Sequence, residues 1–134
     1  MANTAFLKID GKESPLHYLS YEFHRHIEDN GKPATRIRRG TISMTKDSIL
    51  DKGSFTTWMA DPDKQKDGEI TIYTDEKKEK KLKVIKFQHG YVIDYRETFD
   101  LEKAANNTLE SFTISAEIIE VDSAKFDFKW PESY

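Results

Sequence analysis

The sequence contains no cysteine, only six glycines and four prolines, and no apolar run that approaches the ~20 residues of a membrane-spanning helix. Without cysteine, disulfides, thiolate chemistry and zinc sites that need thiolate ligands are excluded. The glycines are scattered, so the chain has no glycine-rich phosphate-binding loop. The N-terminal residues lack the basic segment and apolar stretch of a Sec signal peptide, so any export would follow another route.

The composition predicts one folded domain over residues 1–134. Apolar residues make up 37% of the chain and charged residues 34%, while eight Phe, six Tyr and two Trp supply large rings for a core. A disordered chain would not carry so many aromatic residues. The net charge of −3 argues against a general nucleic-acid binder.

Two long alternating segments, residues 16–27 and 35–45, flank a turn region at residues 29–33 that contains Asn30-Gly31. Asn-Gly between alternating runs predicts a β-hairpin, and the extra residues indicate a longer loop than the tightest type. Alternation predicts one apolar and one polar face in the first segment: Leu19, Tyr21 and Phe23 against Ser20, Glu22, His24 and His26. Polar outward faces on long strands suit a surface, or a sheet that continues into a neighbour, better than an enzyme pocket.

Further strands are expected at residues 6–11, 69–74, 82–99 and 110–121, which gives six or seven in all. A helix is predicted from Ser48 or Gly53 to Ala60, because the apolar spacing changes there. Its Trp58 and Met59 would pack on the sheet. Many strands joined by short turns indicate a sandwich or a barrel.

Strand parity predicts which side chains face the core. One shared face of the strand is expected for Ile85, Phe87, His89, Tyr91, Ile93 and Tyr95, and inward positions are expected for Phe112, Ile114, Ala116 and Ile118. Gly40 stands where the apolar register changes, so a β-bulge is expected there. The tail, residues 123–134, would be an edge strand or a docking arm, because Phe126, Phe128 and Trp130 are too apolar to leave in water.

No pattern of catalytic residues emerges. His24 and His26 would share a strand face and could hold zinc with a third ligand, but no motif supplies one, and a polar surface role is preferred. The carboxylates between Asp61 and Asp67 resemble a calcium loop only superficially, since a proline and two lysines interrupt them. No nucleophile motif such as Gly-x-Ser-x-Gly is present, so no enzymatic activity and no cofactor are predicted.

An ordered set of short segments carries a resemblance over nearly the whole chain. The segments are Ile9-Asp10-Gly11-Lys12, Tyr18-Leu19-Ser20-Tyr21-Glu22-Phe23-His24-Arg25, Asn30-Gly31-Lys32-Pro33, Gly40-Thr41-Ile42, Trp58-Met59, Gly68-Glu69-Ile70, Phe87 to Tyr95, Phe112-Thr113-Ile114-Ser115-Ala116 and Trp130-Pro131. Together they resemble the type VI secretion tube protein, the haemolysin-coregulated protein, in the TssD form of bacteroidete-type systems.

The resemblance implies a compact β-barrel or two-sheet fold of six to eight strands with one flanking helix. It implies a non-enzymatic subunit of a homohexameric ring, with rings stacked into a hollow tube inside a contractile sheath and tipped by a spike. Small effector proteins would travel in the lumen. Such a protein would assemble in the cytoplasm and then be secreted through the type VI apparatus without a Sec signal.

The protruding loop from Asn30 to Ala34 is the expected ring-stacking element. The candidates for ring stacking or for the lumen are Asn30, Gly31, Lys32, Pro33, Arg36, Arg38 and Arg39. The arginines depart from the small, glycine-rich stretch expected at this position, and they are assigned to the lumen or to an inter-ring contact.

Two other functions stay open at this point. A stand-alone β-sandwich could bind a protein or a glycan through the aromatic tail. A hydrolase or metal protein could use His24, His26 and a nearby carboxylate.

Overall fold

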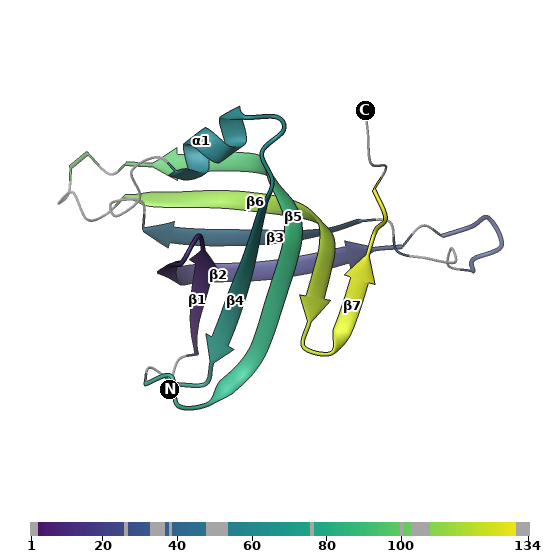
Figure 1. The fold of residues 1–134 in the computed structure, drawn as a ribbon, viewed down its shortest axis with the longest axis horizontal. Helices are drawn as coiled ribbons and strands as arrows, with labels where there is room; N and C mark the ends of the chain where they lie inside the picture. Colours follow the sequence, from purple (N-terminus) through teal and green to yellow (C-terminus); the bar gives the residue numbers. More distant parts are fainter. Residues whose placement is uncertain are drawn as a thin grey trace.

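The computed structural model describes residues 3–25, 27–32, 37, 39–47, 54–75, 77–99, 101–102 and 108–130. Within these residues the chain forms seven strands and one short helix (Figure 1). The elements are β1 (Thr4–Ile9), β2 (Lys12–His24), β3 (Arg39–Asp47), α1 (Ser54–Ala60), β4 (Lys66–Tyr73), β5 (Lys81–Thr98), β6 (Leu109–Val121) and β7 (Ala124–Asp127).

The strands form one antiparallel sheet in the order β3-β2-β1-β4-β5-β6-β7. Because β3 also pairs with β6, the first six strands close into a barrel, and β7 is added to β6 outside it. Closure leaves the six barrel strands without a free edge over the paired stretches. The mainly β fold with one helix predicted from the sequence is therefore confirmed.

The turn between β1 and β2 shows how local sequence sets the register. Ile9 pairs with Lys12, so Asp10 and Gly11 form a two-residue turn. Both have positive φ, 55° and 77°, as a type I′ turn requires. The first strand ends at this turn, as the sequence predicts.

Alternation along the strands fills the barrel with apolar side chains. The fully or almost fully buried ones include Leu7, Ile42, Met44, Ile70, Ile85, Phe87, Ile114 and Ile119. Helix α1 lies against β5, and its Phe55 and Trp58 are buried. Trp58 packs as predicted, and its indole Nε1 donates to the carbonyl of Lys64 at 3.0 Å. Met59 does not pack as expected, because the short helix turns its side chain outward, 40% exposed.

The predicted parity of β5 is wrong beyond Phe87. Phe87 is buried, but the next buried positions are Gly90 and Val92 rather than His89 and Tyr91. The change of parity falls at His89, which has a φ of 59° and donates its backbone N–H to the Asp67 carboxylate at 2.9 Å. A left-handed residue bends the strand sharply, so the residues on either side of it reverse their facing.

A second irregularity in β5 lies between Val92 and Asp94, where the pairing with β6 shifts by one residue. This bulge leaves Ile93 outside, 46% exposed, and returns Tyr95 to the inner side. The prediction is thus wrong for Ile93 and right for Tyr95.

Strand β6 bends opposite the bend of β5. Ala116 and Ile119 are buried, whereas Ile118 is only partly buried, so the predicted inward position is off by one residue. The reversal falls at Glu117, whose carbonyl accepts the backbone N–H of Phe128 at 2.9 Å.

Gly40 forms no bulge, contrary to the expectation. It pairs in register with Phe23, and the only shift between β2 and β3 lies near Leu16 and Tyr18. A Cβ atom at Gly40 would lie 2.6 Å from Cδ1 of Phe23, far inside a normal contact. The glycine is therefore needed because the Phe23 ring lies across it.

The aromatic tail docks on its own barrel. The ring of Phe126 stacks on that of Phe23 with centroids 4.0 Å apart, and Phe128 is buried. The backbone N–H of Trp130 donates to the Glu117 carboxylate at 2.9 Å, and its indole contacts Tyr91. The tail is thus an added edge strand followed by a docked arm, as its apolar pattern predicts.

Candidate assembly surfaces

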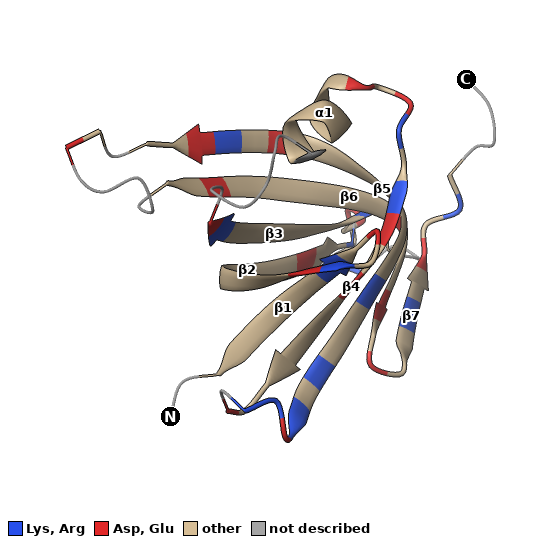
Figure 2. Cartoon of the chain, turned by 60° about the vertical axis from the view of Figure 1, so that its left-hand side comes forward, with Lys and Arg blue, Asp and Glu red and all other residues tan. Residues whose placement is uncertain are grey.

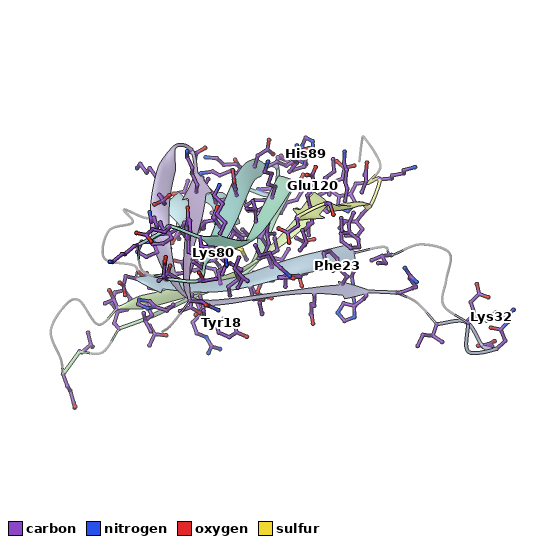
Figure 3. The ribbon with its side chains drawn as sticks, turned by 90° about the horizontal axis from the view of Figure 1, so that it is seen from below. Tyr18, Phe23, Lys32, Lys80, His89 and Glu120 are labelled. Atoms are coloured by element: carbon purple, nitrogen blue, oxygen red, sulfur yellow. The ribbon has the colours of Figure 1, made fainter. Side chains whose placement is uncertain are left out.

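The loop between β2 and β3 extends far from the barrel, and Figure 3 shows Lys32 at its outer end. The backbone N–H of Gly31 donates to the carbonyl of Glu28 at 2.8 Å, and that of Glu28 donates to the carbonyl of Lys32 at 2.9 Å. The side-chain oxygen of Asn30 accepts the N–H of Lys32 at 2.9 Å, and Gly31 has a φ of 84°. The Asn-Gly signal therefore builds a closed turn at the tip of a protrusion.

The predicted site residues fall into two groups. Asn30, Gly31 and Lys32 lie together and exposed at the tip, whereas Arg39 is the exposed first residue of β3, opposite His24 at the base of the loop. The remaining candidates, Pro33, Arg36 and Arg38, lie outside the described residues.

The outer face of β3 and β6 carries a ladder of hydroxyl groups. Its members are Thr41, Ser43, Thr45, Ser111, Thr113 and Ser115, all half-buried. Ser43 and Thr113 are hydrogen-bonded at 3.0 Å, as are Thr45 and Ser111. Figure 2 shows the middle parts of both strands free of charged residues. The ladder is thus a neutral polar surface, which matches the polar outward faces predicted from the alternation.

An open depression of about 410 Å³ lies on this face. Ser43, Thr45, Ser111 and Thr113 contribute to its lining, together with residues of β2 and β5 at its edges. Tyr18, the partner of Thr45 across β2 and β3, also lines the depression. These serines and threonines are not among the site residues predicted from the sequence, although their strict alternation with Ile42, Met44, Phe112 and Ile114 indicates such a face.

A buried ion pair lies behind this face at the barrel end that α1 covers. Lys46 Nζ lies 2.6 Å from Glu110 Oε1, and the two side chains are only 4% and 2% exposed. The residues are direct partners across β3 and β6. Lys46 also lies over the ring of Phe55 from α1, at 5.2 Å. Burial of both charges is tolerable because each has a partner at short range.

Tyr95 completes this cluster from β5. Its hydroxyl donates to Glu110 Oε2 at 2.6 Å. Burial raises the pKa of the Tyr95 hydroxyl well above its usual range, and the hydrogen bond to the Glu110 carboxylate raises that pKa further. This cluster is not among the sites predicted from the sequence, although Lys46 and Glu110 both stand at inward-facing positions where apolar residues would be expected.

The histidines are dispersed rather than gathered. His24 lies 3.3 Å from Glu22 on the same strand, and His17 lies 2.9 Å from Asp47 across β2 and β3, while His26 falls outside the described residues. In the part of the chain that the structure describes, no three His, Asp or Glu side chains are placed to hold a metal ion.

Asp61, which follows α1, and Asp67, at the start of β4, accept hydrogen bonds from backbone N–H groups of the same chain. Asp61 Oδ1 accepts the backbone N–H of Asp63 at 2.9 Å, and Asp67 accepts that of His89. The first contact is that of a turn, and the second joins β4 to β5.

The chain is a six-stranded closed barrel with one short helix, a neutral polar outer face and a long protruding loop, and this architecture also occurs in a tube-forming contractile system. The chain is similar to a chain of the sheath–tube complex of the extracellular contractile injection system PVC in its extended state, with a TM-score of 0.61 over 90% of this chain and 88% of that one. At 13% identity this likeness shows the fold.

The sequence profile of the family described as Hemolysin coregulated protein Hcp (TssD) matches residues 1–131. Hcp1 from Flavobacterium johnsoniae superposes with a TM-score of 0.78 at 28% identity, covering 92% of this chain and 98% of that chain. Hcp1 from Salmonella typhimurium gives a TM-score of 0.72 at 14% identity, over 96% and 97%. A comparison with curated proteins finds no match. The chain belongs to the Hcp (TssD) family, which confirms the resemblance noted in the sequence.

The family is that of structural tube proteins secreted by type VI systems. Among the described residues, no helix is long and apolar enough to cross a membrane.

Proposed function

We propose that this chain, as one domain over all 134 residues, is the structural subunit of a type VI secretion inner tube. Six copies form a ring, and rings stack into a hollow tube. The observation that carries the proposal is the family match over residues 1–131, on a closed barrel that superposes on Hcp1. Catalysis plays no part in this role.

We infer that the hydroxyl ladder lines the lumen. A lumen surface must stay wetted and must let cargo pass without holding it tightly. Half-buried Ser and Thr hydroxyls that already bond to one another, as in the Ser43–Thr113 pair, offer hydrogen bonding without fixed charge. Small effector proteins are the proposed cargo, the sheath covers the outside of the tube, and the spike caps its end.

The proposed route to the cell exterior follows from the same role. Assembly takes place in the cytoplasm, and the tube leaves through the type VI apparatus, so no Sec signal is needed.

The alternative function, a stand-alone binding module, is not favoured because the surface proposed for ligand binding is occupied within the chain. That proposal relied on an aromatic tail free to bind a ligand, but Phe128 is buried and Phe126 stacks on Phe23 within the same chain.

Light scattering after size exclusion, over a range of protein and salt concentrations, tests the ring. The expected species has six times the chain mass of 15.6 kDa and gives ring-shaped particles in negative stain. A monomer under every condition would contradict the proposal.

A further inference from the structure

The tip of the loop between β2 and β3 contains the dipeptide Asn30-Gly31, and Figure 3 shows the next residue, Lys32, far from the barrel. Residues 27–32 are all exposed to water. Each of the other asparagines of the chain is followed by a residue that carries a side chain, and these asparagines are Asn3, Asn106 and Asn107. Asn30 is therefore the one asparagine whose following residue has no Cβ atom.

An asparagine followed by glycine can react with its own backbone. The glycine nitrogen gives up its proton to a base in solution and attacks the side-chain amide carbon, which forms a succinimide ring. The side-chain nitrogen takes up a proton and leaves as ammonia. Water then opens the ring at either of its carbonyl groups, which yields aspartate or isoaspartate. A side chain on the following residue hinders the attack, and glycine has none.

The closed turn at the tip keeps the two reacting groups within reach of each other. The Asn30 Oδ1 accepts the backbone N–H of Lys32 at 2.9 Å. This hydrogen bond closes a ring of atoms that contains both the Asn30 amide carbon and the Gly31 nitrogen. The same N–H stabilises the negative charge that develops on Oδ1 when the nitrogen attacks.

One contact in the turn opposes the reaction. The Gly31 N–H donates to the carbonyl of Glu28 at 2.8 Å, so the nitrogen must leave this hydrogen bond before it can attack. The bond lies at the exposed tip of a loop, where local opening costs little free energy. The contact therefore slows the reaction without preventing it.

We propose that Asn30 is a modification site of this protein, at which spontaneous deamidation through the Gly31 nitrogen gives aspartate and isoaspartate. Either product adds a negative charge to a tip that already contains Glu28 and Asp29. Isoaspartate also lengthens the backbone by a carbon atom, which displaces the acceptor of the Lys32 N–H and opens the closed turn. The reaction needs only water, so the inference does not depend on the proposed tube function.

Peptide mapping by mass spectrometry tests the site. Freshly purified full-length protein is kept folded at mildly alkaline pH for several weeks, and samples are digested at acidic pH, where the reaction is slow. Conversion is measured from the mass increase that accompanies exchange of the amide NH2 for a hydroxyl, and fragmentation distinguishes isoaspartate from aspartate. Asn30 should convert at least about tenfold faster than any other asparagine, because modest differences in barrier height give large ratios of rate.

The matched control is Gly31→Ala, which keeps Asn30 and adds a single methyl group. Apart from its chain neighbours, no atom of the described residues lies within 4 Å of that methyl position, although alanine adopts the φ of 84° less readily than glycine. Conversion of Asn30 should fall by at least about tenfold in this variant. An equal rate in the two proteins would show that the Gly31 nitrogen does not attack, and it would overturn the inference.

A synthetic peptide with the sequence of residues 27–33 measures the reaction without the folded turn. We expect the peptide to convert faster than the folded chain, because its Gly31 N–H is not held by the Glu28 carbonyl. If the peptide converts while Asn30 of the folded protein reacts no faster than Asn3, the turn protects the site and the inference is wrong. The rate in the folded protein should also rise with pH, since the Gly31 nitrogen must lose its proton, and a rate independent of pH would contradict this route.

Discussion

Removal of the Lys46 charge should destabilise the protein strongly. In Lys46→Met the Glu110 carboxylate stays almost fully buried and loses the ammonium group 2.6 Å away, retaining the hydroxyl of Tyr95 as a neutral donor. Breaking a buried ion pair from one side costs about 3–5 kcal/mol. We expect the free energy of unfolding to fall by about that amount, with protonation of Glu110 limiting the loss.

The double variant Lys46→Met with Glu110→Leu should recover most of this loss. An apolar pair of similar volume removes the unpaired charge, and such replacements are often neutral or stabilising. Urea unfolding at one fixed protein concentration measures Lys46→Met, Glu110→Leu and the double variant, since assembly makes apparent stability depend on concentration. A loss of less than about 1 kcal/mol of unfolding free energy in Lys46→Met would contradict this prediction, as would a double variant whose loss equals the sum of the two single losses.

Three further predictions concern other parts of the barrel. Burial raises the pKa of the Tyr95 hydroxyl in the folded state, so the protonated hydroxyl stabilises the fold fully below the unfolded-state pKa of about 10. That stabilisation is lost as the pH rises towards the folded-state pKa. Tyr95→Phe should therefore weaken the fall in stability at alkaline pH, followed by circular dichroism. Gly40→Ala should cost about 1–3 kcal/mol in chemical unfolding, because the new methyl group must displace the Phe23 ring, and an unchanged midpoint would contradict that packing. Ser43→Cys should react freely with a bulky maleimide in single subunits but slowly in long tubes. Lys86→Cys, on the part of β5 that pairs with β4, is the control variant. Equal protection of the two cysteines in tubes would argue against a hydroxyl ladder that faces the lumen.

The functional surfaces of this chain are made by strands rather than by clefts. Ser43 and Thr113 come from β3 and β6, which are neighbours only because the barrel closes. The same closure brings Lys46 to Glu110. A structural subunit needs such rigid surfaces, because a tube transmits force through contacts between copies.

Local features of the structure could be predicted from the sequence. The Asn30-Gly31 turn, the alternating face of Leu19 to Phe23 and the end helix with Trp58 all follow from neighbours close in the chain. The spacing of apolar residues and the residue types that favour turns act over a few residues, so they can be recognised in the sequence before the fold is known. The family resemblance also lay in the order of these local segments.

Only the tertiary structure decided the facing of side chains beyond His89 and Glu117. Strict alternation would place Tyr91 and Ile118 inward, but the barrel bends both strands there and reverses their parity. The role of Gly40 likewise depends on the Phe23 ring of another strand, and the charges of Lys46 and Glu110 can be buried only because closure makes them partners. Pairings between residues distant in sequence are set by closure of the whole barrel, and no local pattern contains them.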